Sequence, residues 1–253
     1  MFTLLIANRA MAQNPAGSVT TLTGDVRVER AGTTVPATPG MALDVGDRLV
    51  TGANSRATVT LTDNSKLELD ESTSLIIDQQ MVAANSRNTK LSLFSGLVRS
   101  FVSYTSSPTP NFEVHTPNAV ASARGTEYDT QTSTQMPNGF SEEDRKKYKD
   151  CRRFTQVSVY DGTVEVTNTT NPGAGSVQVS AGHKTRVVCG FVPDPPSEIA
   201  AAAAAGVAAT GGSTAGLFLG SAIVAGGTVG GLAAGRVFSG GGHTHKTTKS
   251  PNQ

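Results

Sequence analysis

The sequence predicts an all-β domain of roughly a dozen short, mostly antiparallel strands, arranged as a two-layer β-sandwich or a roll. The first observation behind this prediction is alternation: Phe112 and Val114 alternate with Glu113 and His115, which is the two-residue period of a half-buried strand. The second is that Gly, Pro, Asn and Asp separate many such segments, while Thr, Ser and Val are plentiful.

The third observation is a weak internal repeat centred on glycine. Gly24, Gly96 and Gly162 each follow an apolar residue by five positions and precede a valine by two. This pattern predicts a strand, a bend at the glycine and a second strand, repeated three times as in a coiled or rolled sheet. It also favours a parallel β-roll as the alternative topology.

The first strands are expected before residue 94. A hairpin is predicted around Asp63-Asn64-Ser65, where Asn64 can adopt the left-handed conformation that tight turns require. The other expected strands of this half lie at 19–30, after the corner at 43–50, at 74–78 and at 90–93.

The stretch 112–128 is predicted to form a strand, a corner and a second strand. Pro117 breaks the first strand because it lacks a ladder N–H, and Gly125 permits a second corner. The last expected strands form a hairpin at 154–166 that turns at Asp161-Gly162, followed by a pair at 176–180 and 184–188.

A polar insertion at 130–150 interrupts the strands. Ser141 is expected to cap a short helix with acidic residues in its first turn and basic residues in its last. The insertion is either a solvated helical excursion or a partner-binding arm. Cys151 and Cys189 are expected to form a disulfide in an oxidising compartment; the alternative is two unpaired thiols.

Both ends of the chain differ from the β-domain. An apolar run followed by Ala10-Met11-Ala12 resembles a truncated signal peptide, and the alternative is an ordinary disordered end. The stretch 199–235 carries no charged residue and repeats small residues at a spacing of four, which is typical of packed membrane helices. A transmembrane helix is therefore expected at 215–237; a flexible apolar tail or a self-associating helix is the alternative.

The expected organisation has five parts. They are a signal peptide and lead-in at 1–17, the β-domain at 18–191, a Pro-rich linker at 192–198, the Gly/Ala-rich segment at 199–237 and a basic tail at 238–253.

Composition argues against several functions. The 21 basic residues balance 20 acidic ones, which gives no electrostatic case for nucleic acid, and aromatic residues are only 5% of the chain. No nucleophile stands beside a base and its orienting group, so no catalytic site, cofactor or metal centre is predicted. Arg124, Gly125, Thr126 and Asp47 are instead candidate structural or partner-binding residues, with Asp47 a suggested partner for the Arg124 guanidinium.

Four motifs resemble those of FecR-type domains, over about residues 19 to 189. They are Phe112-x-Val114-x-Thr116-Pro117 with Arg124-Gly125-Thr126-x-Tyr128, the turn at 46–52, the hairpin at 57–69 and the segment 157–166.

The resemblance implies an extracytoplasmic, non-enzymatic module that binds a partner protein or senses a signal. The family's anti-sigma role uses a cytoplasmic region and a membrane helix ahead of the β-domain, and neither is seen in this sequence. The expected location is therefore the periplasm or cell envelope, with an envelope protein or wall component as partner and self-association through the Gly-rich segment as a further hypothesis. A module that binds wall glycan or exopolysaccharide is the alternative function.

Overall fold

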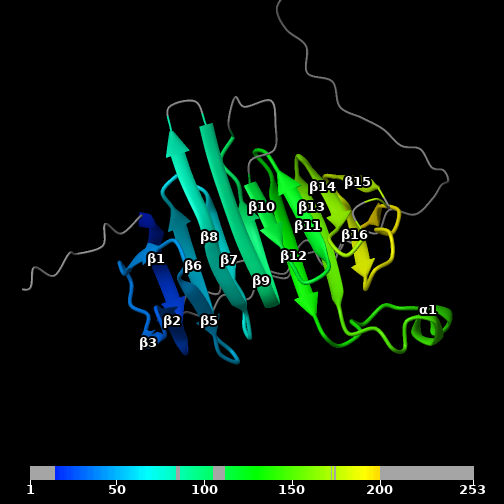
Figure 1. Cartoon of the computed structure of the whole chain (residues 1–253), viewed down its shortest axis with the longest axis horizontal. Helices are drawn as coiled ribbons and strands as arrows, with labels where there is room; N and C mark the ends of the chain where they lie inside the picture. The colour runs from blue at the N-terminus through cyan, green and yellow to red at the C-terminus, as the bar shows by residue number, and fades with distance from the viewer. Residues whose placement is uncertain (1–14, 84–85, 105–111, 172, 174, 200–253) are drawn as a thin grey trace, which may run out of the picture. The chain divides into compact units, whose positions relative to one another are not determined.

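The computed structural model describes residues 15–83, 86–104, 112–171, 173 and 175–199 (Figure 1). These residues belong to one compact unit, 1–208. The expected membrane helix at 215–237, the basic tail and most of the expected leader lie outside the described residues. The part of the chain that is described contains no helix with the length and apolar character needed to cross a membrane.

The all-β prediction is confirmed: 60% of the structure is strand and 4% is helix. The hydrogen-bonded strands form two layers, which we call layer A and layer B. The order in layer A is β4-β1-β6-β7-β9-β12-β13-β16-β17, and in layer B it is β3-β2-β5-β8-β9-β10-β11-β14-β15. Strand β9 belongs to both layers, because its first half pairs with β8 and its second half with β12.

The longest strand of layer A is β9, with 16 residues, and the others have two to nine residues. Their bounds are β1 Pro15–Thr23, β4 Ala42–Asp44, β6 Arg56–Leu61, β7 Lys66–Leu69, β9 Ser86–Phe101, β12 Glu127–Ser133, β13 Phe154–Asp161, β16 His183–Val188 and β17 Ser197–Glu198.

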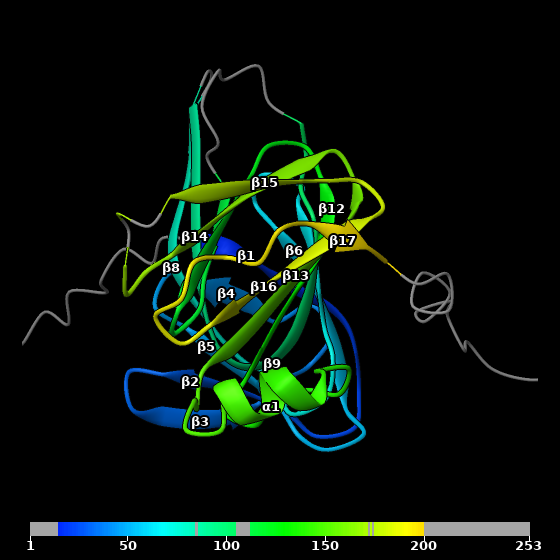
Figure 2. The ribbon, with the colours of Figure 1, turned by 90° about the vertical axis from the view of Figure 1, so that its right-hand side faces the viewer.

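Layer B has the same number of strands because the chain alternates between the layers. Its strands, besides β9, are β2 Val26–Arg30, β3 Thr33–Pro36, β5 Arg48–Thr51, β8 Ser74–Ala83, β10 Phe112–His115, β11 Ala119–Ala123, β14 Thr163–Asn168 and β15 Ser176–Ser180. Figure 2 looks at the end where β15, β16 and β17 lie.

The three repeated glycines are the points where the chain bends from one layer into the other. Gly24 separates β1 from β2, Gly96 lies within β9, and Gly162 separates β13 from β14. All three have positive φ, of 79°, 87° and 77°, a conformation that side chains other than glycine's avoid. The glycine repeat in the sequence therefore corresponds to three positions at which the chain bends from one layer into the other.

The topology is an antiparallel sandwich with bent strands. Strand β10 pairs in parallel with the first half of β9, and every other pairing among the described strands is antiparallel. The alternative of a parallel β-roll is therefore wrong. Alternate residues of each strand point between the layers, as in β6, where Ala57, Val59 and Leu61 are buried.

The limits of the described sheet differ from the expected ones at both ends. Pro15 to Gly17, expected in the lead-in, begin β1 and pair with β4. Ser197 and Glu198, expected in a linker, pair with Lys184 and His183 of β16. The strand count also exceeds the expected dozen, because 17 strands are described, several of them only two to four residues long.

Candidate functional site

The corner Arg124-Gly125-Thr126 carries the chain from β11 in layer B to β12 in layer A. Gly125 has a φ of 65°, and a Cβ added there would lie 2.8 Å from the ring of Tyr104. The Arg124 guanidinium lies 5.8 Å from the centre of the same ring, while Thr126 is buried. The corner therefore packs on Tyr104, and its glycine is required by both backbone conformation and space.

Asp47 has a different arginine partner from the one suggested by the sequence. Its buried carboxylate accepts a hydrogen bond from Arg30 Nε at 2.7 Å and a second from Arg30 Nη2 at 2.5 Å. The backbone N–H of Asp44 donates to the same carboxylate at 2.8 Å. The hydrogen bond to Asp47 is the main reason that the pKa of Arg30 is raised. This group joins β2 to the corner before β5, so the Asp47 carboxylate pairs with Arg30 instead of the suggested Arg124.

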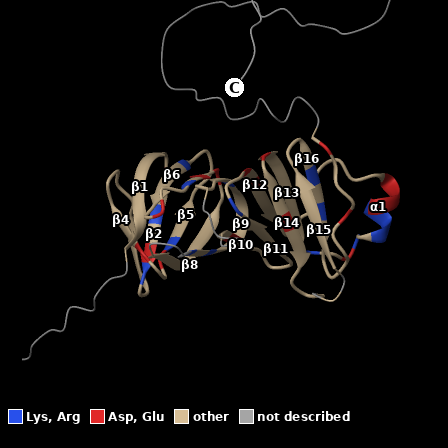
Figure 3. Cartoon of the chain, turned by 90° about the horizontal axis from the view of Figure 1, so that it is seen from above, with Lys and Arg blue, Asp and Glu red and all other residues tan. Residues whose placement is uncertain are grey.

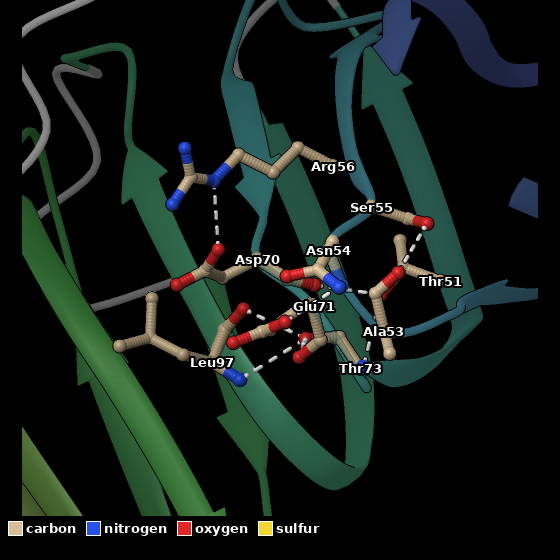
Figure 4. A network of polar contacts seen from close by, with 9 residues as sticks. All are labelled: Thr51, Ala53, Asn54, Ser55, Arg56, Asp70, Glu71, Thr73 and Leu97. Atoms are coloured by element: carbon tan, nitrogen blue, oxygen red, sulfur yellow. Dashed lines mark hydrogen bonds and ion pairs between the residues drawn. The ribbon is translucent and has the colours of Figure 1, made fainter. Parts of the chain in front are cut away.

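A polar network joins neighbouring bends near the middle of the sheet (Figure 4). Thr73 Oγ1 donates to the carbonyl of Leu97 and accepts from its N–H, both at 3.1 Å. Thr51 Oγ1 accepts from the Thr73 N–H at 2.9 Å, and Glu71 accepts from the Asn54 N–H at 2.7 Å. These bonds satisfy backbone groups at the bends, so the network serves the fold.

The insertion forms a small platform beside the sandwich. Helix α1, Glu142–Lys147, is capped by Ser141 as the sequence predicts, because the Ser141 side chain accepts from the Asp144 N–H at 3.1 Å. Acidic residues fill its first turn and basic residues its last (Figure 3). No residue of α1 itself is buried, which matches the expected solvated helix.

Residues flanking α1 attach it to the sandwich through a second hydrophobic cluster, which the sequence analysis missed. This cluster contains Phe140, Tyr148, Phe154 and Val188, all buried. The alternation that reveals strands does not reveal aromatic contacts between a loop and a sheet.

The two cysteines lie beside this cluster. Cys151 and Cys189 form the predicted disulfide, with their Cα atoms 5.9 Å apart. The bond joins the end of the insertion to the residue after β16. We call the unit formed by 136–151 and 186–197 the α1 platform.

The platform contains a hollow of about 310 Å³ between α1 and the segment leading to β17. Its charged members include Lys147, Arg186 and Asp194, and Arg186 Nε donates to Asp194 at 3.1 Å. The Arg186 guanidinium also lies 4.2 Å from the centre of the Phe140 ring. The complete lining is Asp144, Lys147, Tyr148, Thr185, Arg186, Asp194, Pro195 and Ser197.

An exposed aromatic residue lies next to this hollow. Phe191 is 45% exposed, packs edge-on against Tyr148 at 5.2 Å and lies 5.4 Å from Lys147 Nζ. A hydrogen bond to Tyr148 raises the pKa of Lys147, which keeps that amine charged. An exposed aromatic ring surrounded by charges of both signs is typical of a protein-binding surface.

A second polar cluster lies on the outer face of layer A. Arg99 donates to both carboxylate oxygens of Asp129, at 2.7 and 3.0 Å, and Tyr160 Oη donates to Asp129 at 2.8 Å. The Arg99 guanidinium also stacks 4.4 Å from the Tyr160 ring centre. The three groups satisfy one another across β9, β12 and β13, which favours a role in sheet stability.

Metal ligation finds no support in the part of the chain that is described. No three His, Cys, Asp or Glu side chains lie together there in a way that could hold an ion. His115 lies 2.6 Å from the Glu113 carboxylate, and His183 lies 3.1 Å from the carbonyl of Ala181.

The fold and its surfaces define an all-β module built on bent strands, with an added disulfide-bonded platform. A model of the family described as FecR protein matches residues 47–165, which run from Asp47 to Glu165 and include the Arg124 corner and α1. Residues 47–165 therefore match a FecR domain, as the motifs predicted. No curated protein matches the chain.

Two solved structures resemble part of this chain. Both are of a candidate anti-sigma factor from Parabacteroides distasonis ATCC 8503, determined at 2.50 and 1.65 Å resolution. Each is 16% identical and covers 60% of this chain, with TM-scores of 0.43 and 0.42. The match spans 59% of those chains.

Proposed function

We propose that the chain is a non-enzymatic FecR-domain protein of the cell envelope that recognises a partner protein or relays its binding as a signal. The observation that carries the proposal is the α1 platform on a FecR domain. It presents the exposed Phe191, the charged hollow and the charged helix α1 on one tethered unit. We assign partner recognition to this platform.

The chemistry of the platform fits a protein partner. Aromatic and arginine side chains provide much of the binding energy in protein interfaces. Phe191 packs on Tyr148, which lines the hollow, and Arg186 is itself a lining residue. The hollow is small and charged side chains line it, so its size and polarity suit a side chain or a short loop of a partner protein. The chain lacks tryptophan, which disfavours the alternative of glycan stacking.

The disulfide supports an extracytoplasmic location. Disulfides persist in the periplasm and outside the cell and are rare in the cytosol. The bond between Cys151 and Cys189 holds the platform that we assign to recognition. Cell fractionation followed by protease treatment of spheroplasts tests this location: the β-domain of an exported protein is cut, whereas a cytoplasmic one survives.

A matched pair of variants tests the platform itself. Phe191→Ser removes an exposed ring next to a lysine, and Phe94→Ser removes one that is 46% exposed and lies 4.7 Å from Arg48. We expect crosslinking in envelope extracts to give a specific protein adduct that Phe191→Ser loses and Phe94→Ser retains. Equal yields of the adduct with both variants would exclude the platform as the partner-binding surface. Equal retention of the natural chain and both variants on peptidoglycan would favour the wall-binding alternative.

A further inference from the structure

The edges of the two layers differ in how they are protected. Within the described residues four strands pair on one side only: β3, β4, β15 and β17. Two of these are three residues long or shorter, and β3 ends in Pro36, which cannot donate to another strand. Strand β15 has neither protection, because its five residues, Ser-Val-Gln-Val-Ser, include no charge and no proline.

The hydrogen-bond pattern shows which groups of β15 face outward. The Ala181 N–H donates to the carbonyl of Gly162 at 3.0 Å, one step beyond the pair Thr163–Ser180. Because bonding alternates along an antiparallel pair, Val179 and Val177 bond to β14. The N–H and C=O groups of the remaining residues therefore point away from the sheet: Ser176, Gln178 and Ser180.

The same alternation is found on the other side of β14. The Thr169 N–H donates to the Asn118 carbonyl at 3.1 Å, one step beyond the pair of Asn168 with Ala119. Thr167 and Glu165 therefore bond to β11, which leaves the intervening valines of β14 to bond to β15. Two independent contacts thus give the same assignment of the outward groups.

The sequence of β15 reads the same in both directions, and this selects the partner. A second β15 strand placed antiparallel, with Gln178 opposite Gln178, brings Ser176 opposite Ser180 and Val177 opposite Val179. The backbone groups of Ser176, Gln178 and Ser180 in one copy then face the same groups in the other copy, and no charged side chain faces another. On the inner face, the partly buried Val177 gains an apolar neighbour.

We propose that β15 is a dimerisation edge, at which two copies of this chain join their layers B around a two-fold axis at Gln178. An isologous contact of this kind needs a self-complementary strand, and β15 provides one. The contact is only five residues long, so the dimer is expected to be weak and to depend on protein concentration. The platform that we assign to partner recognition, 136–151 and 186–197, includes no residue of β15, so either proposal can fail without the other.

Substitutions that add a charge at Gln178, on the proposed two-fold axis, test this proposal on the full-length chain in mild detergent. Gln178→Lys and Gln178→Glu each place like charges opposite each other in a homodimer, and the exposed side chain leaves the monomer fold intact. We expect sedimentation velocity over a dilution series to show a dimer for the natural chain and its loss in each variant. An equimolar mixture of the two variants restores the dimer, because opposite charges then meet.

Thr34→Lys provides the matched control, since it adds the same charge to the exposed edge strand β3 and should leave dimerisation unchanged. A dimer that survives in both Gln178 variants would overturn the proposal, because another part of the chain then joins the copies. A chain that is monomeric at all concentrations would also overturn it.

Amide hydrogen exchange decides between a second copy and the chain's own later residues. The Ile199 N–H donates to the Gly182 carbonyl, so the last described residue lies at the turn between β15 and β16. For a dimer, protection of the Ser176, Gln178 and Ser180 amides rises with protein concentration. Protection that is already complete in a monomer would refute dimerisation and assign the edge to the chain's own continuation.

Discussion

Replacing Gly96 with alanine tests the idea that the central strand can bend between layers only at a glycine. Gly96 has a φ of 87°, which costs an alanine about 1–2 kcal/mol. An added Cβ would also lie 2.5 Å from the Cα of Thr73. This neighbour is backbone and cannot rotate away, so overpacking adds about 1–3 kcal/mol. We expect the free energy of unfolding to fall by about 2–5 kcal/mol in total.

Gly40→Ala separates the two contributions. Gly40 has nearly the same φ, 81°, but a Cβ added there meets no atom within 4 Å. Its cost should therefore be the conformational one alone, about 1–2 kcal/mol. Urea unfolding of both variants, followed by circular dichroism, measures the difference. If the free energies of unfolding of Gly96→Ala and Gly40→Ala differ by less than about 0.5 kcal/mol, the inference that an added Cβ clashes at the bend is refuted.

Three further predictions concern the polar and covalent links. Asp47→Asn weakens a buried, charge-assisted hydrogen bond and should lower the free energy of unfolding by about 1.5–3 kcal/mol in urea titrations. Replacing Cys151 and Cys189 with serine should destabilise the domain by up to about 4 kcal/mol, since the bond closes a separation of 38 residues. Burial and the nearby Asp129 raise the pKa of Tyr160 to about 12, so its folded-state stabilisation is complete below pH 10 and disappears as pH rises from 10 to 12.

Each of these predictions has a control. Asp25→Asn removes an exposed ion pair and should cost less than about 1 kcal/mol, so equal losses at Asp25 and Asp47 would contradict the importance of burial. The double serine variant should melt at the same temperature with and without reductant, whereas the natural chain should melt lower when reduced. Ultraviolet titration of tyrosinate in Tyr160→Phe should lack one transition near pH 12; an unchanged titration would contradict the assignment.

The local features of the fold were predictable because they depend on neighbours in the chain. The left-handed Asn64 in its hairpin, with a φ of 63°, follows from turn chemistry between two alternating segments. The Ser141 cap follows from a short polar residue ahead of acidic ones. The glycine repeat follows from the need for positive φ at each bend, so three separated glycines predicted three bends.

The candidate site was less predictable because its contacts join distant parts of the chain. The sequence singled out Asp47 as a polar turn residue, but its partner Arg30 is chosen by the pairing of β2 with β5. The hollow on the platform likewise combines Lys147 with Asp194, which only the pairing of β13, β16 and β17 brings together. An exposed ring such as Phe191 has no periodic signal in the sequence.

By itself, the sequence determined the all-β class, the bend positions, the capped helix, the disulfide pair and the FecR resemblance. The disulfide pair follows from the chain having only two cysteines. The other features depend on backbone conformation, on a two-residue period or on a short motif, all of which can be read from neighbouring residues. Only the tertiary structure decided the strand order, the parallel pairing of β10 with β9 and which edges remain open. Strand pairing is a choice among many segments of similar composition, and it is settled by packing of the shared core between the layers. The exposed edge at β15 is likewise not readable from its own residues, because the pairing of all the other strands determines which strand lies at an edge.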